Sequence, residues 1–235
     1  MMPATTDYIG DELELFAHAV NWKHYWGQKV KPYLGNHVLE VGAGMGTNTP
    51  FLLQSHKIFK RWVCLEPDEA LALKAKKRLS EYPLVEVQNC YLSDFKTKEK
   101  FDSILYIDVI EHIEDDAKEI KLAKSFLKPG GHLIILVPAH QYLYSDFDKA
   151  IGHYRRYTKR MLKNTVGEDL KLEQLLYLDS VGITASVVNK LFLKQRYPTL
   201  KQVQFWDRNL VRLSKISDWI LGYRFGKSLL GIWSN

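Results

Sequence analysis

One short glycine-rich segment constrains the fold of this 235-residue chain more than any other feature. An apolar, β-prone run from His37 to Val41 is followed by a turn with glycine at positions 42, 44 and 46. A helix is predicted to begin directly afterwards at Thr49-Pro50, with Thr49 as its N-cap. Glycines in such a turn adopt positive φ angles and let a ligand approach the backbone closely. The order of strand, glycine turn and helix is typical of nucleotide-binding α/β folds.

The remaining apolar runs predict one α/β domain over residues 1–235. Together with residues 37–41, they indicate seven strands, the others at residues 62–66, 85–89, 101–107, 133–137, 173–178 and 228–233. A helical cap over residues 1–34, containing one aromatic helix from Glu12 to Tyr33, should precede the sheet. A helical insertion over residues 183–225 should separate the last two strands and act as a lid.

The composition excludes several classes of protein. The chain is 46% hydrophobic and 26% charged, which allows a large core and argues against global disorder. Its two cysteines lie in strand-like runs, so neither a disulfide framework nor a metal site is predicted. Without a signal-peptide pattern or a run of about 20 apolar residues, we expect a cytoplasmic protein with no transmembrane segment. The net charge of +6 lies mainly after residue 183, which favours an anionic acceptor or surface.

Two acids beside the glycine turn indicate the kind of ligand. Glu40 lies two residues before Gly42, where a carboxylate can meet a cationic α-amino group rather than a pyrophosphate. Thr47 stands where a dinucleotide-binding turn has its third glycine. Glu66 ends the second strand, where it can accept hydrogen bonds from both hydroxyls of a ribose. The glycine spacing and Glu40 favour S-adenosylmethionine over a nicotinamide dinucleotide, whereas both cofactor classes use an acid in the position of Glu66.

Three segments, in this order, resemble the class I S-adenosylmethionine-dependent methyltransferases. They are VLEVGAGMG at residues 38–46, FDSILYIDVIEHI at 101–113 and LKPGGHL at 127–133. The resemblance covers about residues 35–137. It implies a Rossmann-like α/β fold whose seven-stranded, mostly parallel sheet has helices on both faces and an antiparallel last strand. It also implies methyl transfer with S-adenosylmethionine as the cofactor.

The same resemblance implies roles for individual residues at the cofactor. Glu40 and the turn would hold the methionine moiety, Glu66 would hold the ribose, and Asp108 would lie near the sulfonium. After the third strand the chain departs from the family pattern, because it reads Cys90-Tyr91-Leu92. The backbone around Leu92 would then frame the adenine. The expected cofactor-binding residues are Glu40, Gly42, Ala43, Gly44, Gly46, Glu66, Pro67, Leu92, Asp94 and Asp108.

A second, narrower resemblance lies after the fifth strand, where residues 148–158 read DKAIGHYRRYT. The segment is similar to one in a methyltransferase subgroup of glycan and natural-product pathways. Because it follows a strand, it should cross the carboxyl edge of the sheet, where ligands bind. His153 is then a candidate general base, and Arg155 and Arg156 can grip a carboxylate or phosphate. Alternatively, both arginines pair with nearby acids such as Asp148 and anchor the loop.

Further histidines and aromatic residues belong to the expected acceptor site. His140 follows the fifth strand and His112 follows the fourth, so both are additional candidate catalytic residues. The aromatic N-terminal helix and the insertion near Phe205 and Trp206 should close over the acceptor. The expected acceptor-binding residues are Trp22, Tyr25, Trp26, Tyr154 and Tyr157.

Together these features predict O-methylation of a small-molecule or peptide acceptor, at a hydroxyl or a carboxylate. A hydroxyl acceptor needs a base, whereas a carboxylate needs only to be positioned. The basic, aromatic insertion would also suit a nucleic-acid methyltransferase. The chain lacks the Asn-Pro-Pro-aromatic and paired-cysteine motifs of such enzymes, which makes nucleic acid the weaker choice. A nicotinamide-dependent oxidoreductase, a non-catalytic binding module and a membrane-surface role for the insertion are also compatible with the sequence.

Overall fold

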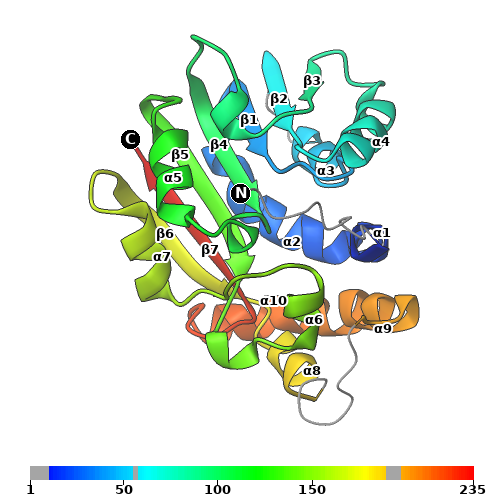
Figure 1. The fold of residues 1–235 in the computed structure, drawn as a ribbon. Helices are drawn as coiled ribbons and strands as arrows, with labels where there is room; N and C mark the ends of the chain where they lie inside the picture. The colour runs from blue at the N-terminus through cyan, green and yellow to red at the C-terminus, as the bar shows by residue number, and fades with distance from the viewer. Residues whose placement is uncertain (1–10, 55–57, 189–196) are drawn as a thin grey trace.

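A seven-stranded sheet forms the centre of the protein (Figure 1). This computed structural model describes residues 11–54, 58–188 and 197–235. The strand order is β3-β2-β1-β4-β5-β7-β6, and β7 is antiparallel to both of its neighbours. The predicted fold class is confirmed. The strands are β1 His37–Val41, β2 Arg61–Leu65, β3 Val85–Gln88, β4 Phe101–Ile107, β5 Leu127–Pro138, β6 Lys171–Leu178 and β7 Ser228–Ser234.

The strand order reverses between β1 and β4, and this reversal positions the site. Both strands are parallel, so their carboxyl ends open at the same edge of the sheet. In doubly wound α/β folds a crevice for ligands forms at such a switch point. The fifth strand is longer than the sequence predicted, because the Pro129-Gly130-Gly131 segment lies inside β5. The register of β4 with β5 shifts there, and Gly130 has a φ of 72°, so the expected turn is a local irregularity of the strand.

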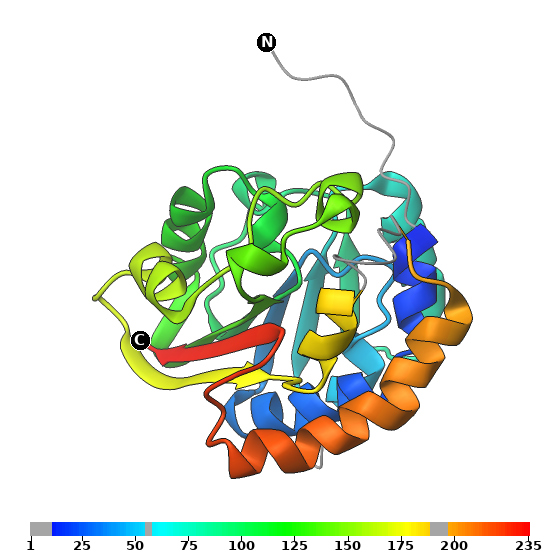
Figure 2. The same cartoon turned by 90° about the horizontal axis from the view of Figure 1, so that it is seen from below.

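Helices cover both faces of the sheet, as Figure 2 shows. Successive strand residues point to opposite faces, so Val38 belongs to one buried cluster and Leu39 to the other. Helices α5 and α7 pack on the Leu39 face, whereas α2, α3 and α9 to α10 pack on the Val38 face. The helices are α1 Asp11–Ala17, α2 Val20–Val30, α3 Thr49–Leu53, α4 Glu69–Leu79, α5 Asp116–Lys124, α6 Asp146–Ala150, α7 Lys159–Val166, α8 Gly182–Val188, α9 Leu200–Phe205 and α10 Val211–Ile220.

The N-terminal aromatic helix is not the single helix that the sequence predicted. It breaks near His18 and Ala19 into α1 and α2. The carboxylate of Asp207 accepts hydrogen bonds from the backbone N–H groups of Asn21, at 3.1 Å, and Trp22, at 2.8 Å. Because these amides lie in the first turn of α2, Asp207 satisfies donors that a helix start leaves unpaired. The insertion therefore fixes where α2 begins.

Between β6 and β7 the chain forms α8 and then a continuous helical stretch over residues 200–220. That stretch consists of α9, one π-helical segment (Trp206–Leu210) and α10. Residues 1–10 of the expected cap and 189–196 of the expected insertion lie outside the described residues. Within the described part of the chain, every helix is too short or too polar to cross a membrane.

Candidate functional site

The glycine turn after β1 leaves one glycine facing open space. Gly42, Gly44 and Gly46 have φ angles of 69°, 55° and 68°, a region that favours glycine. A Cβ atom on Gly42 would lie 2.6 Å from Val109, so that glycine is needed for packing. Among the described residues, a Cβ on Gly44 would meet only the side chain of Leu13, at 3.4 Å. The backbone at Gly44 can therefore be approached closely by a ligand.

Glu66, directly after β2, faces this turn. Its Oε2 accepts a hydrogen bond from the Gly44 N–H at 2.7 Å, and its Oε1 accepts one from the Asp68 N–H at 3.0 Å. Burial raises the pKa of the Glu66 carboxyl, and the two backbone hydrogen bonds oppose that shift. A carboxylate offers about four acceptor positions, so two remain for the hydroxyls of a ribose. The side-chain amide of Asn89 holds this segment by donating to the carbonyls of Glu66 and Pro67.

Glu40 is enclosed between β1, β2 and the start of α3. Its Oε2 accepts hydrogen bonds from the Thr49 hydroxyl at 2.8 Å and the Trp62 indole N–H at 2.9 Å. Thr49 is the first residue of α3, and its hydroxyl serves Glu40 instead of capping the helix as the sequence predicted. Burial raises the pKa of Glu40 despite these bonds. The buried carboxylate of Glu40 thus connects β1 to β2 and to the start of α3, on either side of the glycine turn.

A buried lysine that the sequence reasoning missed lies beside the turn. Lys23 on α2 is only 4% exposed, and its Nζ donates to the carbonyls of Ala17 and Thr47 at 3.3 and 3.4 Å. Burial and the nearby Arg78 lower the pKa of Lys23 to about 8, against the attraction of Asp207 and Glu40. Nothing in the spacing of the helix distinguishes Lys23 from an exposed lysine.

Leu92 and Asp94 are the residues expected beside the adenine. Leu92 is buried and packs in the hydrophobic core, so that only its backbone is available to a base. Asp94 ends the short 3-10 helix Leu92–Asp94 and is exposed. Cys90 is partly buried, and burial raises the pKa of its thiol.

Asp108 directly follows β4, at the carboxyl edge of the sheet. Its backbone has a φ of 55°, unusual for a residue other than glycine, and its N–H donates to the Leu136 carbonyl at 2.8 Å. Water reaches the side chain, yet the surrounding protein desolvates it. Desolvation raises the pKa of Asp108 to about 7, opposed by the positive charges of Lys227 and Arg156. Such a perturbed carboxyl in a cleft is typical of functional sites.

Lys227, directly before β7, interacts electrostatically with Asp108. Its Nζ lies 3.4 Å from Oδ2 of Asp179 and 3.8 Å from the centre of the Trp206 ring. Burial lowers the pKa of Lys227, while Asp179 and Asp108 raise it. The sequence reasoning did not single out Lys227, because its partners come from β6 and from the insertion.

His140, directly after β5, is placed as a base would be. Its ring is hydrogen-bonded to the backbone of Gly226 and stacks on Tyr177, with ring centres 4.6 Å apart. Nε2 of His140 is buried and has no hydrogen-bond partner among the described residues. Burial lowers the pKa of His140, which keeps the imidazole neutral. A neutral imidazole held through one nitrogen can accept a proton on the other.

Residues 152–158, the GHYRRYT segment, form ion pairs with Asp148 and Asp116. Arg156 grips Asp148 with two hydrogen bonds, Nε to Oδ1 at 2.7 Å and Nη2 to Oδ2 at 2.9 Å. His153 Nδ1 lies 2.9 Å from the same Oδ1, and these partners keep the pKa of Asp148 well below its usual range despite burial. Arg155 pairs with Asp116 at 2.8 Å. Both arginines therefore have the acidic partners that a loop-anchoring role requires.

The predicted aromatic acceptor residues are mostly internal. Trp22, Tyr25 and Trp26 are buried, and the Tyr25 hydroxyl donates to Asp218 at 2.7 Å. The hydroxyl of buried Tyr157 donates to Asp116 at 2.6 Å, while Tyr154 is 53% exposed.

Another group of aromatic rings joins α1, α6 and the insertion to Lys227. Phe16 on α1 packs against Phe147 and Trp206, with ring centres 6.3 and 6.1 Å away. Trp206 in turn contacts Lys227. Segments distant in sequence form this contact, and no local pattern indicates it.

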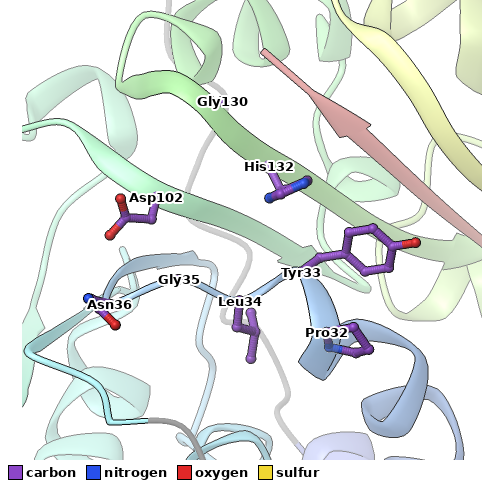
Figure 3. A pocket seen from close by; sticks show the side chains of 8 residues that line it. All are labelled: Pro32, Tyr33, Leu34, Gly35, Asn36, Asp102, Gly130 and His132. Atoms are coloured by element: carbon purple, nitrogen blue, oxygen red, sulfur yellow. The ribbon is translucent and has the colours of Figure 1, made fainter.

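A separate shallow cavity of about 260 Å³ lies at the opposite edge of the sheet (Figure 3). Gly35, Asp102 and His132 line it, at the amino ends of β1, β4 and β5. The Asp102 carboxylate is already engaged by the His37 N–H at 2.8 Å and Lys128 Nζ at 2.9 Å. This cavity shares no residue with the glycine turn, Glu66 or Asp108.

Comparison with known proteins agrees with this geometry. Residues 39–133 match a family model described as a methyltransferase domain. The ubiquinone biosynthesis O-methyltransferase of Coxiella burnetii is 31% identical over 101 residues, 42% of this chain and 42% of that protein. An uncharacterized 37.1 kDa transposon protein of Streptomyces fradiae is 24% identical over 172 residues, 70% of this chain and 49% of that protein. The chain thus aligns with less than half the length of either relative.

The fold is similar to that of a solved methyltransferase. The N-methyltransferase NodS from Bradyrhizobium japonicum, in complex with S-adenosylhomocysteine, superposes with a TM-score of 0.57 at 16% identity, covering 98% of this chain and 89% of that one. The family match covers residues 39–133, and the seven-stranded sheet has the fold of solved methyltransferases. Both findings support S-adenosylmethionine, the cofactor that the sequence predicted.

Proposed function

We propose that this chain transfers the methyl group of S-adenosylmethionine to an oxygen atom of an anionic small-molecule or peptide acceptor. The main support for this proposal is that three features lie at the same edge of the sheet. These are the open backbone at Gly44 with Glu66, the perturbed carboxyl of Asp108, and the buried Nε2 of His140.

The residues around the turn suit the cofactor. Glu66 would hold the ribose hydroxyls, and the backbone at Leu92 would face the adenine. Lys23 would bind the methionine carboxylate, because its ammonium is buried beside the turn with only two long hydrogen bonds to carbonyls among the described residues. Asp108 would lie next to the sulfonium, whose positive charge favours an ionised carboxyl. When bound, S-adenosylmethionine supplies a methyl group that is already strongly electrophilic.

The acceptor would enter between Asp108, His140 and Lys227. A hydroxyl acceptor has to lose a proton as the methyl group arrives, and His140 Nε2 is the base we assign to that proton. Lys227, whose ion pair with Asp179 is 3.4 Å long, would meet a carboxylate or phosphate elsewhere on the acceptor, whereas Arg156 is already held by Asp148. Phe16, Phe147 and Trp206 would exclude water from the reacting atoms.

Relatives with this fold include N-methyltransferases such as NodS, so nitrogen is the competing acceptor atom. An amine acceptor must be neutral to react, and His140 could equally accept its proton. Product analysis by mass spectrometry after incubating the protein with cell extract and S-adenosylmethionine decides between them. A methyl ether or ester supports the proposal, and a methylamine overturns the choice of oxygen.

Calorimetric titration with S-adenosylhomocysteine tests the cofactor site. Glu66→Gln should weaken binding about 10- to 100-fold, since a hydrogen-bonded charge contributes about 1.5–3 kcal/mol. Asp102→Asn, in the cavity of Figure 3, is the matched control and should bind like the wild type. Equal affinities in wild type and Glu66→Gln would contradict the proposed site.

A further inference from the structure

A buried carboxylate lies next to two histidines at the end of β4. Glu111 is fully buried, yet neither of its carboxylate oxygens has a hydrogen-bond partner among the described residues. His153 Nε2 lies 3.8 Å from Glu111 Oε1, and the His112 and His153 rings are 4.5 Å apart. One ligand atom from each of the three residues falls within 4.8 Å of the others. An ionised carboxylate is costly to bury without hydrogen bonds, and a cation bound beside Glu111 would offset that cost.

The two histidines are oriented as metal ligands usually are. A metal-binding imidazole commonly uses its other nitrogen to hydrogen-bond a carboxylate or a backbone carbonyl. Nδ1 of His153 is 2.9 Å from Asp148 Oδ1, and the His112 ring is hydrogen-bonded to the backbone of Gly152 and Ile151.

We propose that Glu111, His112 and His153 bind a divalent transition metal ion, with zinc as the representative. Two imidazole nitrogens and one carboxylate oxygen are ligands that Zn²⁺ accepts, whereas Mg²⁺ prefers oxygen alone. Donors about 2.1 Å from a tetrahedral ion lie roughly 3.4 Å apart, so the side chains need only a small contraction around the metal. The ion would join the end of β4 to the GHYRRYT segment. This proposal is independent of the methyl acceptor.

Metal binding is measurable without any enzymatic assay. Protein stripped with a chelator and titrated with Co²⁺ should develop visible d–d absorption that saturates at one ion per chain and is displaced by Zn²⁺ but not by Mg²⁺. Zn²⁺ should also raise the melting temperature of the stripped protein. Glu111→Gln should weaken Zn²⁺ binding by more than about 100-fold, beyond the loss typical of an outer-shell change.

The variant Glu111→Gln is expected to fold, because a neutral amide resembles a protonated buried carboxyl. His18→Ala, at an exposed histidine, is the matched control and should retain full metal binding. Failure of the stripped wild type to bind Co²⁺ or Zn²⁺ at one per chain would overturn the proposal. Unchanged affinity in Glu111→Gln would do so as well, and would leave the three residues as an internal hydrogen-bonding group.

A second, independent observation concerns the outer surface of the helical stretch over residues 200–220. Exposed apolar side chains recur along α9 and α10 and just beyond them, and several exceed half of their full exposure. They are Phe205, Leu213, Ile216, Trp219, Ile220, Leu221 and Phe225. Leu213, Ile216 and Ile220 share one side of the helix by their spacing, and in Figure 2 this helix lies at the outside of the molecule. Singly exposed apolar residues are common, but a row of this size marks an interaction surface.

The charges around this row are of one sign. Arg208, Arg212 and Arg224 are exposed beside it, whereas both acids of the stretch, Asp207 and Asp218, are buried and face inward. A helix with an apolar row, a tryptophan and flanking arginines is the kind that lies in the headgroup region of an anionic bilayer. We infer that this apolar–basic surface docks on anionic membranes.

Vesicle sedimentation tests the docking surface. The protein should partition onto phosphatidylglycerol-containing vesicles, less onto pure phosphatidylcholine vesicles, and less again at high salt. The double variant Ile216→Ser/Trp219→Ser should reduce partitioning by more than about tenfold, because two large apolar side chains no longer enter the bilayer. Leu73→Ser, at a 69% exposed leucine on α4, is the matched control and should partition like the wild type.

Two results would overturn the membrane inference. One is equal partitioning of the wild type and the double variant. The other is a concentration-dependent dimer in light scattering that Ile216→Ser/Trp219→Ser abolishes, because the surface would then be covered by a second copy of the chain.

Discussion

The raised pKa of Asp108 predicts a pH-dependent preference for S-adenosylmethionine over S-adenosylhomocysteine. The two ligands share the same amino and carboxylate groups and differ at the sulfur, which is cationic only in S-adenosylmethionine. The pKa of Asp108 in the free protein is about 7, so the carboxyl is ionised at pH 8 and protonated at pH 5. A neighbouring sulfonium lowers that pKa, so S-adenosylmethionine should lose affinity as the pH falls through 7.

The size of the effect follows from the shift. If the sulfonium returned the Asp108 pKa to its ordinary value of about 3.9, the ratio of the affinity for S-adenosylmethionine to that for S-adenosylhomocysteine would fall by about 80-fold between pH 8 and pH 5. Water reaches the side chain and screens the interaction, so we expect roughly half of the pKa change and a change of about 20-fold.

Calorimetric titration of both ligands at pH 5, 6, 7 and 8 measures the ratio. A chelator should be present, so that a metal ion at Glu111 does not contribute. Asp108→Asn should make the ratio independent of pH, while S-adenosylhomocysteine affinity changes little. A ratio that stays constant from pH 5 to pH 8 in the wild type would refute the placement of Asp108 beside the sulfonium.

Three further predictions concern the cofactor carboxylate, the base and the start of α2. Lys23→Met should weaken S-adenosylhomocysteine binding about tenfold in calorimetry. Because the pKa of Lys23 is about 8, the wild type should also lose affinity as the pH rises above 8, and this loss should be absent in Lys23→Met. His140→Ala should lower turnover of a hydroxyl acceptor about 10²–10⁴-fold in steady-state kinetics, with cofactor affinity retained. Asp207→Ala should lower the free energy of unfolding in urea by about 1–3 kcal/mol, because it leaves the buried N–H of Trp22 unpaired; an unchanged value would contradict its role in starting α2.

The fold was predictable because its signals are local. Apolar runs of strand length alternate with helical patterns, and the glycine turn marks where the first strand meets its helix. The break between α1 and α2 was not predictable, since the carboxylate that causes it comes from Asp207, 186 residues after Asn21. The long β5 was missed for a similar reason, because Gly130 and Gly131 exchange backbone hydrogen bonds with Asn235, directly after β7, although they read as a turn.

The candidate site was predictable only in part. Gly44 and Glu66 follow strands in a recognisable pattern, and they lie together in the structure at 2.7 Å. Lys23 and Lys227 carry no local signal, because only tertiary packing buries them. His153 was expected to face an acceptor, but its position against Asp148 depends on a contact that the motif does not specify.

A crystal structure of the protein with S-adenosylhomocysteine tests the central claim most directly. We predict electron density for S-adenosylhomocysteine in which the ribose hydroxyls contact Glu66, the sulfur lies beside Asp108 and the carboxylate lies at Lys23. Clear density for the ligand elsewhere, such as in the cavity lined by Asp102 and His132, would contradict it.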